Sequence, residues 1–225
     1  MMQDVKLNYL STIQILRDLS HDELIQMDRQ VTMATCQSGK IFYMPEESGE
    51  VLFLLKQGRV QLYRLSPNGK KLVIATLGPG AVFGEMSIVG QGMHNTFAEA
   101  VDECTLCVMS RFDVQRLMRD KPQVAFRFVE ALGDRLTETE RRLEDIAFKS
   151  IPARLAGLLL ELADEQEDAS MVRGYTHQDL GEMLGTYRET ITQTLNEFKS
   201  RGLLSISRKQ IILENRPGLE KLAEY

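Results

Sequence analysis

The sequence predicts a mixed α+β protein in which a strand-rich region is followed by a long helix and then by a pair of short helices. Three patterns predict this order: short apolar runs separated by turns over residues 38–110, an unbroken helical period over 111–148, and two helix starts beyond residue 175. Short strands at regular spacing are typical of an antiparallel sandwich or barrel, and apolar residues at steps of three and four are typical of helices.

The composition limits the class of protein. The chain has 225 residues, of which 43% are hydrophobic and 26% charged, as in ordinary globular domains and unlike disordered or fibrous chains. No apolar run approaches the roughly 18 residues of a membrane span, and residues 1–6 show no secretory signal. With only 3 cysteines, a disulfide framework is not expected, which predicts a cytoplasmic protein. The net charge of −5 gives no global sign of nucleic-acid binding, so a local basic patch must supply any attraction to DNA.

The strand-rich region is preceded by helical segments and is punctuated by turns. Ser20 is a suitable N-cap for one of these early helices. Alternation over residues 60–65 predicts a strand, and the Ser-Pro-Asn-Gly sequence at residues 66–69 predicts a hairpin turn before the next run at 71–77. A further run at residues 103–109 closes the region, which we therefore expect to fold as an antiparallel sandwich or barrel.

The long helical segment carries a regular apolar seam. Nothing between residues 111 and 148 breaks a helix except Pro122, which suits a helix start. The seam recurs at alternating steps of three and four and is flanked by charged residues, which is typical of a two-stranded coiled coil. We therefore expect a parallel homodimer; packing of the helix on its own domain is the alternative. The predicted interface residues are Val129, Leu132, Leu136, Thr139, Leu143 and Ile146.

The C-terminal third has the spacing of a helix-turn-helix. Thr176 precedes Asp179 by three residues and Thr186 precedes Glu189 by three, which is the spacing of a capping box, so two helices are expected to begin there. Gly185 stands where a left-handed helix end favours glycine. A short helix, a glycine turn and a second helix with a small polar outer face indicate a DNA-binding helix-turn-helix.

The second of these helices is expected to have two different faces. Steps of about 100° per residue place Ile191, Leu195 and Phe198 on the inner side and the polar residues from Glu189 to Gln193 on the outer side. Arg188 lies nearer the boundary, in the first turn, from which its long side chain can reach forward. Strands expected at residues 203–206 and 210–213 form a wing with a basic turn. Arg can pair with guanine, Glu can accept from cytosine and Gln can pair with adenine, so the outer side suits the reading of base edges. The predicted DNA-binding residues are Thr176, His177, Gln178, Thr186, Tyr187, Arg188, Glu189, Thr192, Gln193, Arg208 and Lys209.

Two glycine-punctuated motifs lie in the strand-rich region, FLLKQGRV at residues 53–60 and GAVFGEM at residues 80–86. Together with the long helix and GTYRET at residues 185–190, they resemble the catabolite activator protein and fumarate-nitrate reductase regulator (CRP/FNR) family of bacterial transcription regulators. The resemblance runs from about residue 15 to residue 215. It implies N-terminal helices and a cyclic-nucleotide-binding-type β-roll over residues 1–110, a dimerisation helix over 111–148 and a winged helix-turn-helix over 149–225.

The resemblance also implies roles for individual residues of the helix-turn-helix. Arg188 and Glu189 match the family's base-reading pair, whereas Gln193 stands at the position of the family's second base-reading arginine. The preferred half-site is therefore expected to differ from that of the catabolite activator at one position.

The resemblance further locates an effector pocket. In members that bind cyclic AMP, Gly-Glu is followed by an Arg-Ser pair that holds the cyclic phosphate; here Gly84 and Glu85 are present, but His94 and Asn95 take the Arg-Ser positions. Neutral His is a poor substitute for the forked cation of Arg. Thr139 matches a residue that meets the adenine, but a carboxylate follows it. We therefore expect no cyclic AMP binding, and the effector, if there is one, stays open.

Other chemistries have weaker support. An iron–sulfur cluster needs four thiolates, so Cys104 and Cys107 are instead expected to be core thiols on opposite faces of a strand. No metal site and no set of catalytic residues is predicted. Double-stranded DNA, a second copy of the chain and RNA polymerase are the expected partners, with the charged segment 164–168 as the candidate polymerase contact. The alternative is a ligand-sensing dimer whose helical domain contacts protein rather than an operator.

Overall fold

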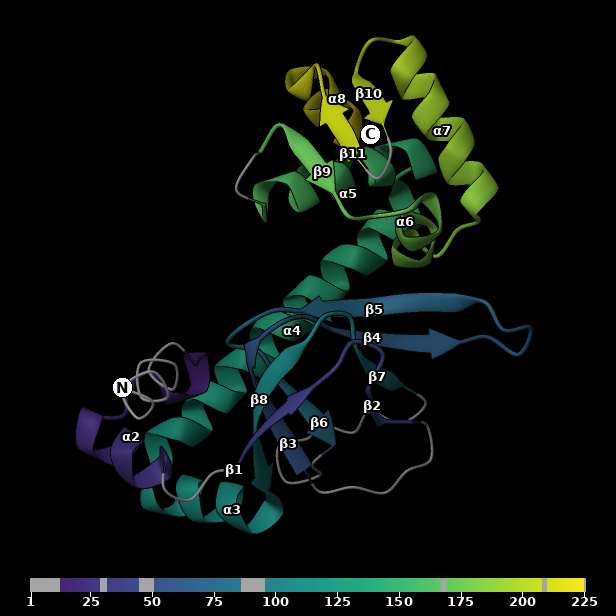
Figure 1. Cartoon of the computed structure of the whole chain (residues 1–225). Helices are drawn as coiled ribbons and strands as arrows, with labels where there is room; N and C mark the ends of the chain where they lie inside the picture. The colour runs from purple at the N-terminus through teal and green to yellow at the C-terminus, as the bar shows by residue number, and fades with distance from the viewer. Residues whose placement is uncertain are drawn as a thin grey trace. The chain divides into compact units, whose positions relative to one another are not determined.

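A computed structural model describes residues 13–28, 32–44, 51–85, 96–166, 169–207 and 210–224. The chain divides into two compact units, one comprising residues 1–65 and 74–136 and the other residues 66–73 and 137–225. Figure 1 follows the elements in chain order through both units. Strands dominate the first part and helices the second, so the predicted α+β class is confirmed.

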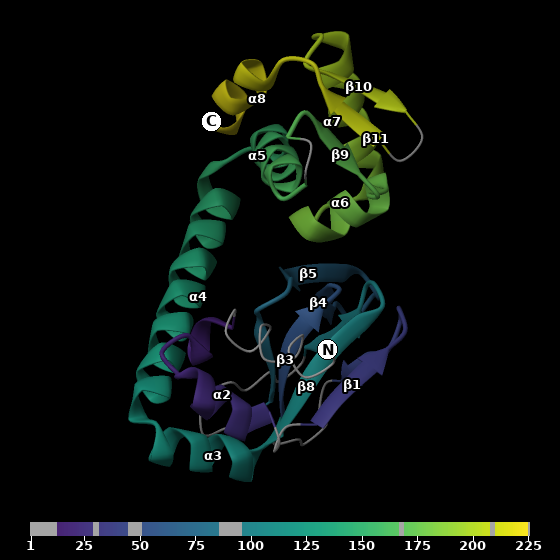
Figure 2. The same cartoon turned by 60° about the vertical axis from the view of Figure 1, so that its left-hand side comes forward.

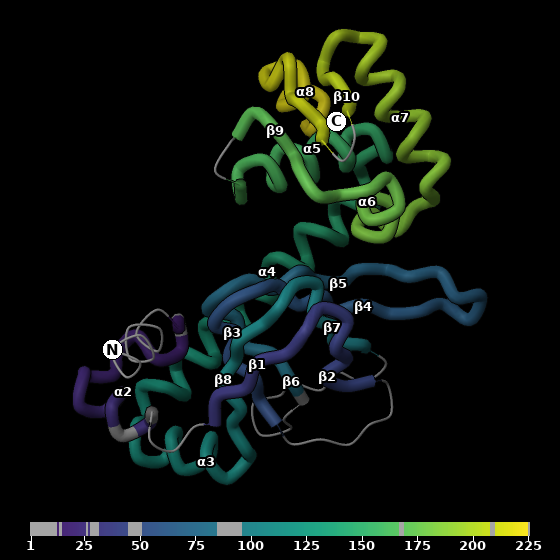
Figure 3. Tube along the Cα trace, in the orientation of Figure 1, coloured from purple at the N-terminus to yellow at the C-terminus, as the bar shows by residue number. Residues whose placement is uncertain are grey.

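The strand-rich region forms two four-stranded sheets, which can be followed as a tube in Figure 3. Strand β8 pairs antiparallel with β1 and β3, and β7 pairs antiparallel with β2 and β4, as the predicted sandwich requires. The first sheet has the order β1 (Thr32–Cys36), β8 (Cys104–Ser110), β3 (Val51–Gln57) and β6 (Val82–Glu85); the second has the order β2 (Ile41–Tyr43), β7 (Phe97–Ala100), β4 (Val60–Leu65) and β5 (Lys71–Leu77).

Strand β8 serves two hydrophobic cores because its side chains point to opposite faces of the sheet. Cys104 and Leu106 pack in a cluster that draws on both sheets, including Phe83 of β6. Cys107 and Met109 pack on the other face, in a cluster that includes residues of the surrounding helices. Both cysteines are fully buried, so the prediction of two core thiols on opposite faces is confirmed.

The helices of this region begin where the sequence predicts. The α2 helix (His21–Asp28) is capped by Ser20, whose amide donates to the Glu23 carboxylate at 2.7 Å and whose hydroxyl accepts from the Glu23 amide at 3.4 Å. Pro122 is the first residue of α4 (Pro122–Phe148), where its missing N–H costs nothing. Two further elements are η1 (Gln14–Leu16) and α3 (Arg111–Asp120).

Four helices and three strands lie wholly within the described part of the second unit, and Figure 2 shows them from another side. They are α5 (Ile151–Asp164), β9 (Met171–Arg173), α6 (His177–Leu184), α7 (Arg188–Ser200), β10 (Leu204–Ser207), β11 (Gln210–Leu213) and α8 (Arg216–Ala223). The strands β10 and β11 are the predicted wing, and β9 joins them in the order β10-β11-β9. The sequence patterns predicted neither β9 nor α8.

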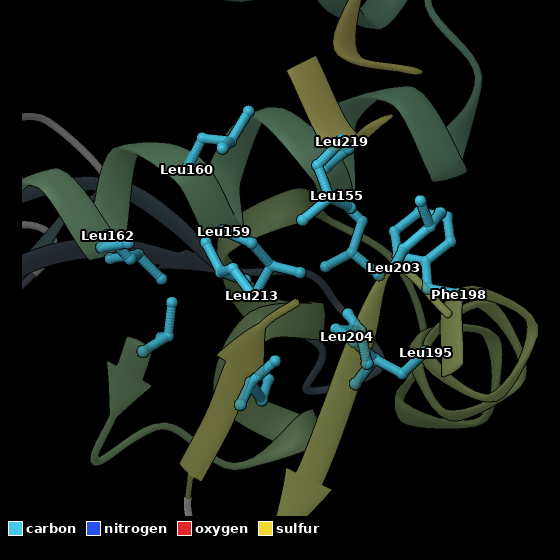
Figure 4. Close-up of a cluster of buried hydrophobic side chains, with 14 of the residues drawn as sticks. Leu155, Leu159, Leu160, Leu162, Leu195, Phe198, Leu203, Leu204, Leu213 and Leu219 are labelled. Atoms are coloured by element: carbon cyan, nitrogen blue, oxygen red, sulfur yellow. The ribbon is translucent and has the colours of Figure 1, made fainter. Parts of the chain in front are cut away.

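One apolar cluster holds the second unit together, as the close-up in Figure 4 shows. Leu155 and Leu159 of α5, Leu195 and Phe198 of α7, and Leu219 of α8 are fully buried in it. The wing joins the same cluster through β10 and β11. Burying such a side chain contributes about 1.5–3 kcal/mol, so this cluster fixes how the two short helices lie against α5 and the wing.

Gly84, predicted to belong to the effector pocket, has a structural role in β6. It lies opposite Leu52 of β3 with φ of 130°, and a Cβ atom added there would lie 2.2 Å from the carbonyl oxygen of Val51. Any side chain at position 84 therefore collides with the backbone of the neighbouring strand. Gly39 also has a positive φ, 83°, but a Cβ atom there meets nothing within 4 Å.

Replacing Gly84 by Ala should destabilise the first unit far more than replacing Gly39 by Ala. The Gly39→Ala change costs only the strain of a positive φ, about 1–2 kcal/mol, whereas Gly84→Ala adds the collision with β3 and should cost about 3 kcal/mol or more. Urea unfolding of the two variants measures the difference in the free energy of unfolding. Equal losses in the two variants would contradict the assignment.

Candidate nucleic-acid interface

The first helix of the pair, α6, has both predicted ends. Thr176 is its N-cap and forms a capping box with Asp179: the Thr176 hydroxyl accepts from the Asp179 amide at 3.2 Å, and the Asp179 carboxylate accepts from the Thr176 amide at 2.6 Å. Gly185 ends the helix in the left-handed conformation, with φ of 68°. A Cβ atom at Gly181 would lie 3.3 Å from the Thr186 carbonyl oxygen, so glycine lets the chain fold back closely.

The predicted capping box at the start of the second helix is wrong. The N-cap of α7 is Tyr187, and it makes no side-chain cap hydrogen bond. The helix therefore begins one residue later than Thr186 requires, and Glu189 falls at its second position rather than its third. The carboxylate still lies in the first turn, where the positive end of the helix dipole favours it.

The two faces of α7 agree with the prediction. Ile191, Leu195 and Phe198 are fully buried in the apolar cluster of the second unit. Arg188, Glu189 and Gln193 are exposed, and the predicted contacts Thr176, Gln178 and Tyr187 are exposed as well. Thr186 and Thr192 are half-buried. The wing residues Arg208 and Lys209 lie outside the described residues.

A hydrogen-bond chain that the sequence patterns did not reveal joins the starts of the two helices. The Thr192 hydroxyl donates to the carbonyl oxygen of Arg188 at 2.9 Å, the usual bond of a helical Thr to the residue four positions earlier. Its oxygen lies 2.9 Å from Nδ1 of His177. Because the single hydroxyl proton is already used, Nδ1 of His177 must donate and carries the proton, which leaves Nε2 as the unprotonated nitrogen of the neutral ring.

The environment of His177 disfavours its charged form. Burial, and then the positive charge of Arg188, hold the pKa of His177 below its ordinary value of 6.5. The neutral ring is therefore the form that the folded helix pair favours near neutral pH.

His177 and Arg188 both line an open hollow of about 420 Å³ between the helix starts and the wing. The other lining residues are Tyr175, Thr176, Gln178, Ile206, Ser207, Gln210 and Ile211. Arg188 is the permanently charged group among these described lining residues. Ser207 and Gln210 are not among the predicted DNA contacts, although both flank the predicted wing turn, and their place beside this turn is the sequence signal that could have identified them.

The apolar seam of α4 is exposed in the single chain. Val129, Leu136, Leu143 and Ile146 are between 59% and 66% exposed, and Thr139 is exposed beside them. Leu132 is half-buried. Packing on the chain's own domain therefore covers little of the seam, and this long apolar strip has the form of an interface.

The charged side of α4 forms ion pairs within the helix. Arg141 binds Glu138 through Nε and Nη2, both at 2.9 Å, and Arg142 binds Glu138 through Nε at 2.7 Å. These two guanidinium groups hold the pKa of Glu138 at about 2. The carboxylate of Glu138 beside the seam is thus paired within its own helix.

The predicted effector residues are only partly placed. Gly84 and Glu85 are paired with Leu52 and Val51 in the β3–β6 ladder, and Thr139 lies on α4. His94 and Asn95 lie outside the described residues. No group of three or more His, Cys, Asp or Glu side chains that would suit a metal ion is found among the residues the structure describes.

Asp164, in the segment predicted to contact RNA polymerase, is the last residue of α5. Its carboxylate binds Arg216 of α8 at 2.8 Å, so this end of the segment is held to the second unit. The contact with RNA polymerase stays a prediction. In the described part of the chain, no helix combines the length and the apolar character needed to cross a bilayer.

Comparison with known proteins identifies both halves of the chain. A cyclic nucleotide-binding domain model matches residues 34–121, and a Crp-like helix-turn-helix domain model matches residues 153–222. The cyclic AMP receptor protein of Thermus thermophilus is 30% identical over 185 residues, which is 82% of this chain and 85% of that protein. A CRP-like cAMP-activated global transcriptional regulator of Mycobacterium tuberculosis is 25% identical over 214 residues, 93% of this chain and 96% of its own.

A solved structure gives the same result for the fold. A CRP/FNR-family transcriptional regulator, also from Thermus thermophilus, matches with a TM-score of 0.72 and 26% identity, covering 86% of this chain and 99% of its own. A cyclic-nucleotide-binding-type domain joined to a Crp-like helix-turn-helix defines a DNA-binding transcription regulator rather than an enzyme. The chain belongs to the CRP/FNR family.

The lowered pKa of His177 should make the stability of the second unit depend on pH. At pH values below the ordinary His pKa of 6.5, the unfolded chain binds a proton more readily than the folded chain. The free energy of unfolding therefore falls as the pH falls from 6.5 to the lowered pKa of His177, and His177 does not change it above pH 6.5. The stability advantage over a His177→Gln variant should therefore shrink as the pH falls below the ordinary pKa of 6.5, as measured by urea unfolding.

An Arg188→Gln variant provides the matched test, because it removes the positive charge next to the ring. The pKa of His177 then rises towards its ordinary value, and the loss of stability at low pH should become smaller. If the stability advantage of the wild type over His177→Gln stays constant, or grows, as the pH falls, this account is contradicted.

Proposed function

We propose that this CRP/FNR-family regulator is a cytoplasmic homodimer that binds a specific operator and does so without cyclic AMP. The observation that carries the proposal is the burial of α7 on one side only: Ile191, Leu195 and Phe198 are fully buried, while Arg188 and Glu189, in its first turn, are exposed. In this proposal residues 1–110, 111–148 and 149–225 are the effector-type, dimerisation and DNA-binding domains.

The exposed row suits the major groove. The guanidinium of Arg188 can donate to both acceptors of guanine, the carboxylate of Glu189 can accept from cytosine N4, and the amide of Gln193 can pair with adenine. The starts of α6 and α7 and the wing surround this row and are suited to phosphate contacts, which position the helix without reading sequence. These supporting contacts are Thr176, His177, Gln178, Thr186, Tyr187, Thr192, Arg208 and Lys209.

The exposed seam of α4 supports the dimer. Two parallel copies would bury Leu136 and Leu143 against each other, and each buried side chain of this size contributes about 1.5–3 kcal/mol. A two-fold dimer presents two recognition helices about 34 Å apart, one helical turn of DNA. A palindromic operator then follows from the symmetry of the protein.

Independence from cyclic AMP rests on the residue types. The M. tuberculosis relative is named as cAMP-activated, and the Arg-Ser pair expected of such members is replaced here by His94 and Asn95. A cyclic phosphate at these positions would lack a permanent, forked cation. The proposal therefore gives the first unit no cyclic AMP role, and leaves either constitutive binding or a different effector.

Selection of bound sequences from random double-stranded DNA, with and without cyclic AMP, tests the proposal. The wild-type protein should enrich the same two-fold symmetric motif in both arms. Arg188→Ala should lose the preference at its base pair and bind the selected operator about 10–100-fold more weakly, because a bidentate contact contributes about 1–3 kcal/mol.

Arg201→Ala is the matched control for Arg188→Ala. It removes the same charge, but Arg201 is the C-cap of α7, about 20 Å from the start of the helix. It should weaken binding modestly and leave the enriched motif unchanged. A motif that is lost in both variants, or in neither, would show that Arg188 does not read a base.

The dimer has its own test. Leu136→Glu puts a charge in the centre of the seam and should give a monomer at micromolar concentration, because burying an unpaired charge costs several kcal/mol. Phe112→Glu is the control, since Phe112 is 64% exposed on α3 and lies outside the seam. Sedimentation equilibrium distinguishes the results, and a wild-type protein that is itself a monomer would refute the proposed assembly.

A further inference from the structure

Two of the three cysteines, far apart in sequence, lie directly opposite each other in the first sheet. Cys36 is the last residue of β1 and Cys104 the first residue of β8, and they are Cα partners in the antiparallel register. Both belong to the apolar cluster between the two sheets, Cys104 as a buried member and Cys36 as a partly buried one. Their side chains therefore leave the sheet on the same face.

The two thiols differ in exposure. Cys104 is fully buried, whereas Cys36 is only half-buried. The Cys104 thiol lies 3.4 Å from the carbonyl oxygens of both Arg59 and Asp102, which accept from it and hold its sulfur in place. An oxidant arriving from solvent therefore meets Cys36 first.

The electrostatics of Cys104 agree with this order. Burial raises the pKa of the Cys104 thiol to about 11, and the neighbouring Cys36 sulfur adds to the rise. The thiolate is the form that reacts with oxidants, so direct oxidation of Cys104 is disfavoured. The interaction of the two thiols also agrees with their sulfur atoms being neighbours.

The geometry is close to that of a disulfide. Directly opposed residues of antiparallel strands have Cβ atoms about 4.5–5.5 Å apart, and a disulfide needs about 3.5–4.5 Å. The two Cβ atoms must therefore approach by about 1 Å for a disulfide to form. This site can accommodate such a movement, since β1 is an edge strand of the sheet and Cys36 is its last residue. An edge strand is held from one side only, so its end can move more easily than a central strand.

We propose that Cys36 and Cys104 are an oxidation site that forms a reversible cross-strand disulfide in the presence of a hydroperoxide. In the first step the Cys36 thiol releases its proton to solvent, the thiolate attacks the terminal peroxide oxygen, and the O–O bond breaks. Cys36 becomes a sulfenic acid, and the leaving hydroxide or alkoxide takes up one proton from solvent and departs as water or an alcohol. In the second step the Cys104 sulfur attacks the Cys36 sulfur, the S–O bond breaks, and water leaves with the proton of Cys104. The peroxide is reduced and the two thiols are oxidised to one disulfide.

The bond ties the end of an edge strand to the central strand β8. Cytoplasmic disulfides are uncommon and, where they occur, are usually transient and redox-sensing. The site needs neither an operator nor a cyclic nucleotide, so this inference is independent of the function proposed above. Cys107, buried on the opposite face of β8, is the natural control.

The test uses the full-length protein with and without hydrogen peroxide, followed by intact mass measurement and peptide mapping without reductant. Wild type and Cys107→Ala should lose the mass of two hydrogen atoms and give one linked peptide pair that contains positions 36 and 104, and dithiothreitol should reverse this. Cys36→Ala and Cys104→Ala should give no linked pair.

A second measurement does not depend on the variants folding. The disulfide constrains the unfolded chain, so the thermal midpoint of wild-type protein should rise by roughly 5 °C or more on oxidation and return on reduction. Three results would overturn the proposal: both thiols still free after peroxide treatment, a bond between the Cys36 residues of two copies, or Cys36 oxidised to a sulfinic acid without any disulfide.

Discussion

The burial of one face of α7 decides which of its side chains reach solvent. Ile191, Leu195 and Phe198 are fully buried against α5, the wing and each other. Rotating the helix enough to hide Glu189 or Gln193 would bring these apolar groups into water, at about 1.5–3 kcal/mol for each large side chain. The outward direction of the polar row is thus a consequence of packing, and the proposed reading of bases depends on an apolar core that lies on the opposite side of the helix.

The angle between the two short helices is fixed by several constraints acting together. Gly185 permits the left-handed end of α6, and Gly181 permits the close return of the chain at Thr186. The hydrogen bond from His177 to Thr192 then links the first turn of one helix to the second turn of the other. A residue at the start of α6 is in this way coupled to the backbone of Arg188, the first residue of the proposed reading helix.

In the first unit, the burial of apolar side chains likewise fixes how the strands are covered. Its central strand β8 has apolar side chains on both faces, so it is covered by the second sheet on one side and by helices on the other. Continuing from β8, α3 and the start of α4 are anchored by the buried Val114, Val124 and Phe128. Beyond this anchor the apolar seam of α4 is exposed, and a second copy of the chain would cover it along its length.

The sequence alone determined the order and type of the main elements. Turn residues, a period of two and a period of three to four are local properties, so the sheets, the long helix, the wing and the N-cap of α6 at Thr176 were predictable from neighbouring residues. The resemblance of the glycine motifs and of GTYRET also identified the family, because these short motifs reflect local backbone needs, such as the positive φ of Gly185.

Tertiary structure decided what depends on residues far apart in the chain. The start of α7 at Arg188 rather than at Tyr187 is set by the close return of the chain at Gly181, so the capping-box spacing at Thr186 was misleading. The short β9 and α8 have too few residues for a clear period, and they exist because they pack on a core supplied by α5 and the wing. The pairing of Cys36 with Cys104 depends on the register between two strands that are far apart in the sequence. No local pattern contains that register, because it is set by the packing of both strands in the folded sheet.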